Sequence, residues 1–323
     1  METIYGSSNW KLTIRREKDH VVILRAVTCD ARAQLPEELF GLPVTVLGDH
    51  ALSPTAKPVS GEEVRIQWGQ EGEWDNRNLL DLTLPATLTD VQNYALYGCR
   101  SLHTLRLSDG IKRWGGGCLM NCRALRFLQL TRVSEKQGET LAFLCGELQD
   151  ELDVTICGTD GSVTRLLFPE YMEEFEENIP HHQFDYHIQG GGFPYHHTFP
   201  GKQLSLRAYD DLWEKYRGTQ TEPDAAMRLA YYRLRWPVEL GDAAEAQYTA
   251  YLRQNGEAVL LWQLSQRDGA GLSLLLQKLE PEEAILHRAC EQARQESNTE
   301  ALALLLERQR KAAPRGFDME FDL

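Results

Sequence analysis

The stretch LTLPATLTDVQNYALYGCRSLHTLRL (residues 82–107) overlaps a second stretch with the same pattern, LRLSDGIKRWGGGCLMNCRALRFLQL (residues 105–130). Shifting the first by 23 positions places leucine on leucine and cysteine on cysteine. The coinciding residues are Leu82, Leu105 and Leu128; Leu84, Leu107 and Leu130; Leu96 and Leu119; Cys99 and Cys122; and Leu102 and Leu125. Such an internal repeat predicts stacked copies of one structural unit, because a single copy cannot bury its own apolar edge.

Each copy predicts a short strand whose alternate leucines point into the interior. The residues between those leucines then share the opposite, exposed face. They are Thr83, Thr104, Arg106, Phe127 and Gln129. Repeated exposed positions form extended binding surfaces, and Phe and Arg are residue types that anchor interfaces. We therefore expect this face to bind a partner protein; the alternative is that Phe127 packs beneath the next turn of the chain.

The 23-residue pattern resembles the BspA-type leucine-rich repeat of bacteria and some protists. The resemblance is specific over residues 76–130 and looser over residues 20–175, which include a degenerate copy at residues 35–52. Leu96 and Leu119 stand where the family prefers Phe. The resemblance implies a leucine-rich solenoid that binds other proteins, and surface adhesion if the chain is secreted, as some members of the family are.

The second half of the chain has a different pattern. After Leu204, apolar residues recur every three or four positions, which predicts amphipathic helices. GLSLLLQ (residues 271–277) and ALALLLE (residues 301–307) match at an offset of 30 and resemble the paired helices of ankyrin-type repeats. The predicted fold class is therefore α+β, with a short-strand leucine-rich repeat solenoid followed by an all-α helical-hairpin repeat domain.

Four segments follow from these patterns. They are a repeat domain with an N-terminal hairpin cap (residues 1–178), a junction rich in histidine and glycine (179–203), a helical domain (204–313) and an acidic-aromatic tail (314–323).

The junction contains PHHQFDYHIQGGGFPYHH (residues 180–197), with five of the nine histidines of the chain. If Gly190 to Gly192 formed a hairpin turn, the return strand would bring His197 opposite Asp185 and diagonal to His187. Two imidazoles and a carboxylate form an acceptable zinc site, so a metal-dependent hydrolase is the enzymatic alternative. Pro194 weakens such a strand, because proline has no N–H to donate to the ladder. We therefore expect the junction to be a connector, and we expect no cofactor.

Composition narrows the remaining functions. The net charge of −14 argues against nucleic-acid binding and against adsorption to an anionic membrane, both of which need clustered Lys and Arg. Seven cysteines, an odd number with no CxxC pair, predict reduced thiols in a cytoplasmic protein. The sequence shows neither an apolar run of membrane-spanning length nor a secretory leader. Cytoplasmic localisation without membrane insertion is expected, with a surface or secreted location as the alternative if a leader has been removed.

Motifs for nucleotide binding, zinc proteolysis and serine hydrolysis are missing from the sequence. The leading hypothesis is a non-enzymatic interaction or scaffold protein that binds an unidentified protein through the leucine-repeat face. A surface-adhesin-like binding protein is the second hypothesis, and the hydrolase at the histidine junction is the third.

Overall fold

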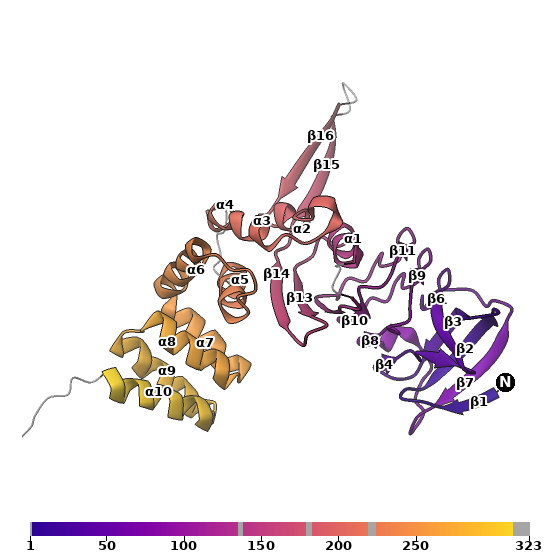
Figure 1. The fold of residues 1–323 in the computed structure, drawn as a ribbon, viewed down its shortest axis with the longest axis horizontal. Coiled ribbons are helices and arrows are strands. Elements are labelled where there is room, and N and C mark those ends of the chain that lie inside the picture. Colours follow the sequence, from indigo (N-terminus) through magenta and orange to yellow (C-terminus); the bar gives the residue numbers. More distant parts are fainter. Residues whose placement is uncertain (1, 135–137, 179–182, 219–223, 313–323) are drawn as a thin grey trace, which may run out of the picture. The chain divides into compact units, whose positions relative to one another are not determined.

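The computed structural model describes residues 2–134, 138–178, 183–218 and 224–312. The chain divides into two compact units, Met1–Thr221 and Glu222–Leu323 (Figure 1). All described strands belong to the first unit, and the second consists of helices. The predicted tail lies outside the described residues, and the finer division of the chain into four segments stays a prediction.

The N-terminal strands of the first unit build a mixed sheet with the order β1-β7-β2-β3-β6-β9-β11, and β5 pairs with β6. Its strands are β1 (Glu2–Tyr5), β2 (Trp10–Arg16), β3 (Val21–Thr28), β5 (Glu38–Leu39), β6 (Leu42–Leu47), β7 (Glu62–Gln67), β9 (Asp90–Val91) and β11 (Arg113–Trp114). Strand β2 pairs antiparallel with β3 and β7, whereas β3–β6 and β6–β9 are parallel pairs. Alternation along β2 buries Trp10, Leu12 and Ile14 on one face of this sheet.

A second sheet has the order β14-β13-β12-β10-β8-β4. Its strands are β4 (Arg32–Gln34), β8 (Asp81–Thr83), β10 (Thr104–Ser108), β12 (Phe127–Thr131), β13 (Leu152–Cys157) and β14 (Val163–Phe168). From β4 to β13 the neighbours are parallel, and β14 joins β13 antiparallel. Leu105 lies opposite Leu82 and Leu128, so the 23-residue offset is the register of β8, β10 and β12.

The predicted fold class, a leucine-rich repeat solenoid joined to an all-α helical-hairpin repeat domain, is wrong. The described residues form a mixed α/β structure, in which parallel and antiparallel pairs share sheets and a helical region follows at the C-terminus. The 23-residue offset holds from β8 to β12, but the chain reverses direction both before and after these strands. Strands β2 and β3 form an antiparallel hairpin, and so do β13 and β14. A hairpin returns the chain through a short turn and does not carry a parallel repeat onward.

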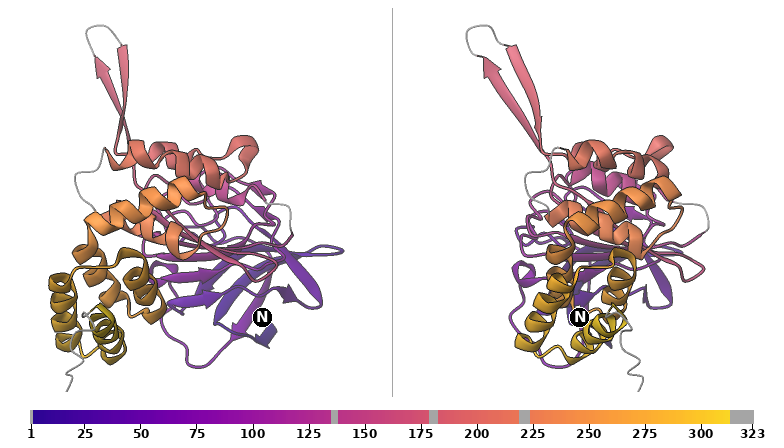
Figure 2. Two further views of the ribbon diagram at one scale, coloured as in Figure 1. Left: turned by 60° about the vertical axis from the view of Figure 1, so that its left-hand side comes forward. Right: turned by 90° about the vertical axis from the view of Figure 1, so that its left-hand side faces the viewer.

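The rest of the first unit is a hairpin surrounded at its base by short helices (Figures 1 and 2). Strand β15 (Met172–Asn178) pairs antiparallel with β16 (Gln183–Gln189) in a separate two-stranded sheet. The short helices are α1 (Thr140–Glu147), α2 (Phe193–His196), α3 (Leu206–Asp211) and α4 (Trp213–Arg217), and the two single turns are η1 (Asn76–Asn78) and η2 (Pro200–Lys202).

The second unit consists of paired helices. They are α5 (Asp224–Arg235), α6 (Asp242–Gln254), α7 (Gly256–Gln266), α8 (Gly269–Leu279), α9 (Glu283–Gln295) and α10 (Thr299–Ala312). Asp268 caps α8 by accepting the Gly271 N–H at 3.0 Å, and its other carboxylate oxygen lies 3.3 Å from the Tyr231 hydroxyl. This cap links the start of α8 to α5.

Candidate functional site

The predicted binding residues share one face of the six-stranded sheet. The parallel register aligns Thr104 with Phe127 in one row and Thr83, Arg106 and Gln129 in the next. All five are exposed or half-buried. Side chains at matched positions of neighbouring strands point to the same side of a sheet, so the structure brings these residues together. We call this surface the sheet face.

Leucines back the sheet face from the other side. Between the exposed positions, Leu82 and Leu105 are 0 % exposed and Leu128 is 2 % exposed. The row formed by Leu84, Leu107 and Leu130 is also buried. Burying a leucine side chain contributes roughly 1.5–3 kcal/mol, so the strands that carry the sheet face are held by a packed interior.

Charged side chains surround the centre of the sheet face. Asp81 lies 3.3 Å from the Arg32 guanidinium and 4.0 Å from that of Arg106. On the β13–β14 side, Arg165 donates two hydrogen bonds of 2.7 and 2.6 Å to the carboxylate of Asp153, which is 5 % exposed. A bidentate pair of this kind fixes the guanidinium in one orientation.

An aromatic side chain occupies the centre of this arrangement. Phe127 is 37 % exposed, and its ring lies 4.8 Å from that of His103 in a tilted contact. Leu80, which precedes β8, is 43 % exposed. Phe127 therefore presents part of its ring to solvent, and the sheet face combines an aromatic residue with arginines, the composition found at energetically important positions of interfaces.

The histidine junction does not form the return strand on which the alternative metal site depended. Phe193–His196 forms helix α2, and β16 pairs with the preceding strand β15. Proline is favoured at the first positions of a helix, where no N–H is needed, and Pro194 occupies such a position in α2. Proline is thus a start signal here, whereas it would have weakened a strand.

The three predicted metal ligands have separate surroundings. His197 follows α2, where its Nδ1 lies 2.8 Å from the Phe193 carbonyl oxygen and its ring stacks on that of Phe193. His187 lies on β16 opposite Glu174 and is exposed. Asp185 also belongs to β16, but its side chain lies outside the described part, so the ligand set stays a prediction. Among the described residues, no group of three or more His, Cys, Asp and Glu side chains is placed to hold a metal ion.

A buried histidine in the junction was not singled out from the sequence. His196 is 1 % exposed, and its two ring nitrogens lie 2.9 Å from the carbonyl oxygens of Cys145 and Pro169. Burial lowers its pKa, while the nearby carbonyls act in the opposite direction. The position of His196, two residues after the helix-starting Pro194, is the signal that could have identified it as a helical residue.

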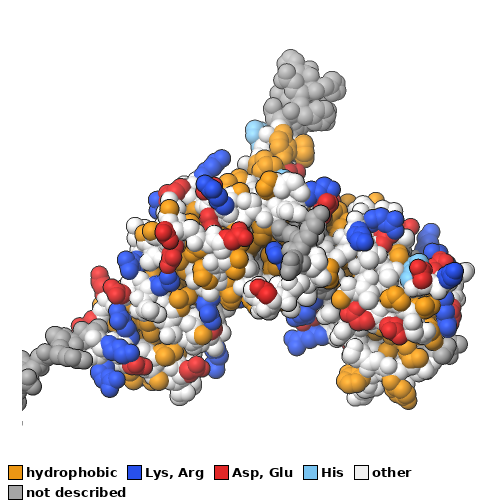
Figure 3. Space-filling model, in the orientation of Figure 1, with side chains coloured by type: hydrophobic (Ala, Val, Ile, Leu, Met, Phe, Trp, Pro, Cys, Tyr) orange, Lys and Arg blue, Asp and Glu red, His pale blue; other side chains and the backbone are white. Residues whose placement is uncertain are grey.

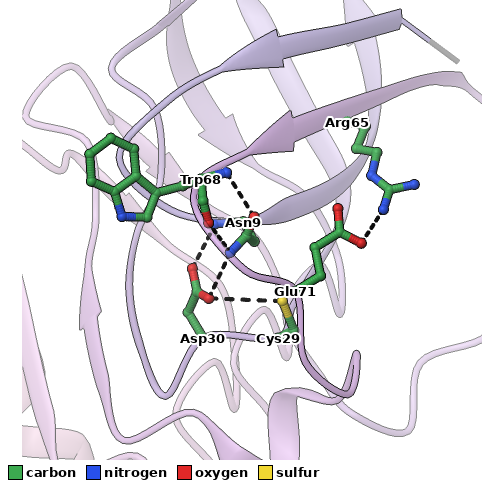
Figure 4. Close-up of polar contacts among 6 residues, drawn as sticks. All are labelled: Asn9, Cys29, Asp30, Arg65, Trp68 and Glu71. Carbon is green, nitrogen blue, oxygen red and sulfur yellow. Dashed lines mark hydrogen bonds and ion pairs between the residues drawn. The ribbon is translucent and has the colours of Figure 1, made fainter.

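Buried polar residues in the N-terminal part also went unpredicted (Figure 4). The Asn9 side-chain amide donates to the Asp30 carboxylate at 2.9 Å and to the Trp68 carbonyl at 2.5 Å, and its oxygen accepts the Trp68 N–H at 2.7 Å. Arg65 pairs with Glu71 in the same region. Asn9 is 1 % exposed, and its side-chain oxygen and nitrogen both hydrogen-bond to other residues of the protein. Its side chain therefore has a structural role and does not contact a ligand.

Four buried cysteines do not have the properties of catalytic thiols. All seven are free. Burial raises the pKa of the Cys118 and Cys122 thiols to about 12 and moves the pKa of Cys99 and Cys145 in the same direction. A raised pKa keeps a thiol protonated, and only the thiolate is a good nucleophile.

A hollow of about 370 Å³ lies beside β3, lined among others by Leu24, Arg25, His50 and Tyr97. The Arg25 guanidinium already donates to the carbonyl oxygens of His50, Ala51 and Ser53 at 2.6–3.3 Å. Nη1 of the guanidinium therefore supports the local backbone.

Comparison with known proteins adds no relative: no family model, curated protein or solved structure matches the chain. In the described part of the chain, no helix combines the length and the apolar character that crossing a membrane requires.

Proposed function

We propose that this chain is a non-enzymatic interaction protein and that the sheet face binds a partner protein. The observation that supports the proposal most is the in-register alignment of Thr104, Arg106 and Phe127 with their neighbours over buried leucines. Such a surface is organised before binding, so little conformational freedom is lost when a partner docks. The resemblance of residues 76–130 to the BspA-type repeat implies the same kind of role and stays a prediction.

The proposal gives Phe127 and Arg106 different tasks. The exposed part of the Phe127 ring would enter an apolar recess of the partner, because aromatic anchors contribute most when a partner removes them from water. Arg106, whose contact with Asp81 is long at 4.0 Å, would complete its hydrogen bonds with carbonyl or carboxylate oxygens of the partner. The proposed location is the cytoplasm.

A photo-cross-linkable phenylalanine analogue at position 127 tests the proposal. The matched control carries the same analogue at position 120, because Met120 is 54 % exposed and belongs to a connection between strands. We expect one protein in a lysate of the producing organism to cross-link through position 127 and not through position 120. Identical products from both positions, or none from position 127, would contradict the proposal.

Affinity measurements then assign the contact. With the cross-linked protein purified, Phe127→Ala and Arg106→Ala are each expected to weaken binding by about 5- to 10-fold or more, whereas Met120→Ala leaves it unchanged.

A further inference from the structure

The β15–β16 hairpin has surroundings unlike those of the other strands in the first unit. It extends away from helices α2 and α3 (Figures 1 and 2). Within the described residues, β15 and β16 pair only with each other, so the outer edge of each strand has no strand partner. Two-stranded hairpins are marginally stable alone, and open strand edges are templates for pairing with another chain.

One face of the hairpin is apolar and open to solvent. The register places Phe175 opposite Tyr186 and Glu173 opposite Ile188. The rings of Phe175 and Tyr186 lie 5.0 Å apart, yet Phe175 is 69 % exposed and Tyr186 is 47 % exposed. Figure 3 shows hydrophobic side chains on the hairpin below the residues drawn in grey. Exposed aromatic side chains that lie together in this way mark an interaction surface.

The hairpin is also strongly acidic. Between Met172 and Gln189 the sequence has four glutamates and one aspartate, with no lysine or arginine. Four of these carboxylates, at positions 173, 174, 176 and 177, belong to β15. Glu174 accepts a hydrogen bond of 2.6 Å from the neutral Gln189 side chain and lies opposite His187 in the register.

An acidic hollow continues this surface at the foot of the hairpin. Its volume is about 370 Å³, and its lining includes Asp150, Glu170, Tyr171, Met172 and Gln189. Asp150 has a cationic neighbour, Arg126, at 3.1 Å. Glu170 is exposed on the same lining. The hollow therefore suits a basic side chain better than an apolar or acidic one.

We infer that the open edge of β15 is a docking site for an extended, basic segment of a partner protein, which adds to the hairpin as a third strand. In such a strand, apolar side chains alternate with lysine or arginine. The apolar set would cover Phe175, and the basic set would lie beside Glu174 and reach the hollow at Glu170. A second copy of this chain is disfavoured as the occupant, because two acidic hairpins would repel each other. The inference uses residues distinct from the sheet face, so either proposal can fail without the other.

The test uses the full-length protein and a fluorescent nine-residue peptide that alternates lysine and valine. One control peptide has glutamate in place of lysine. A second has proline in place of two central valines, which removes N–H donors that the added strand needs. We expect binding of the lysine–valine peptide alone, measured by fluorescence anisotropy, with an affinity that falls as salt is raised.

Matched protein variants locate the site. Phe175→Ser is expected to weaken binding by about 10-fold, and Glu174→Gln by about 3-fold with a smaller salt dependence. Glu63→Gln, at an exposed acidic position on β7, and Met120→Ser, at an exposed apolar position, should leave binding unchanged.

Several results would overturn the inference. The first is no binding at about 1 mM peptide, a concentration at which even a weak specific contact would be seen. The others are equal binding of the proline peptide and equal peptide affinity of the Phe175→Ser and wild-type proteins. A dimer of the wild-type protein that sediments as a monomer after Phe175→Ser would show that a second copy is the occupant, which would also overturn it.

Discussion

Strands β10 and β16 carry the same alternation of apolar and polar side chains, but their surroundings differ. Strand β10 lies between β8 and β12, and its inward residue Leu105 is 0 % exposed. Among the described strands, β16 pairs with β15 alone, and its apolar residues Tyr186 and Ile188 are 47 % and 39 % exposed. Alternation alone therefore does not decide whether a strand forms a core; the number of elements packed against it does.

The same difference separates two kinds of binding surface. The sheet face is supported by a packed interior and presents its side chains in a fixed register, as expected for a surface that binds without rearrangement. The hairpin lacks that support, so a third strand would both cover its aromatic rings and stabilise it. Binding at the hairpin is then coupled to ordering, which lowers affinity for a given contact area.

Truncation of a leucine behind the sheet face is expected to have the largest effect. Leu105→Ala removes a fully buried side chain between two strands and should lower the free energy of unfolding by about 2–5 kcal/mol in urea denaturation. Thr104→Ala, at the neighbouring outward position, should change it by about 0.5 kcal/mol or less. Equal losses from the two variants would show that the sheet face has no packed support.

A substitution at the base of the β15–β16 hairpin should cause the next largest loss of stability. A Cβ atom at Gly192 would lie closer to the carbonyl oxygens of Pro169 and Glu170 than van der Waals contact allows. Gly192→Ala should therefore destabilise the first unit by about 1–3 kcal/mol, measured by urea denaturation. Gly146→Ala is the control, because a Cβ there would meet open space. A neutral result for Gly192→Ala would contradict the close packing of the hairpin base.

Acidification should lower the free energy of unfolding by a smaller amount, through protonation of His196. Burial lowers the pKa of His196 in the folded protein below its ordinary value of 6.5. Below pH 6.5 the histidine is protonated more readily in the unfolded chain than in the folded one. The stability that neutral His196 contributes is therefore fully present above pH 6.5 and is lost as the pH falls toward the folded pKa.

Urea denaturation at about pH 7.5 and pH 5 measures this effect. His196→Asn keeps an amide donor near the carbonyl oxygens but does not titrate, so its stability should change less between the two pH values. A larger loss of stability between about pH 7.5 and pH 5 for the variant than for the wild-type protein would contradict the predicted direction of the His196 effect. Carboxylates whose pKa is lowered, such as Asp19 and Asp160, titrate below this range.

The register of the sheet face could be predicted from the sequence because its information is local and repeated. Parallel strands at a constant offset place Leu105 between Leu82 and Leu128, and the same offset appears in the sequence. The antiparallel pairing of β2 with the distant strand β7 left no such pattern in the sequence. Strand β7 pairs with β2 across about 50 residues, and nothing in either segment specifies the other.

Features outside the sheet face were also beyond sequence reasoning. Asn9 and Asn76 are buried polar residues whose partners come from distant segments, so their roles depend on tertiary structure. The hairpin at β15 and β16 was missed for a different reason. The glycines at 190–192 were considered as the turn of another hairpin, in which residues 193–199 return along residues 181–189, whereas Gly190 and Gly192 pack at the base of β15 and β16 against residues 169–171. Glycine favours close approach as well as turns, and the sequence does not distinguish the two.

Amide hydrogen exchange on the free protein tests the contrast between the two regions most directly. We predict that the amides of β10 exchange only through global unfolding, whereas those of Tyr186 and Ile188 in β16 exchange through local opening and are orders of magnitude less protected. Comparable protection of β10 and β16 would show that the hairpin has support equal to that of the sheet. Rapid exchange in β10 would contradict the claim that the sheet face is a preformed surface.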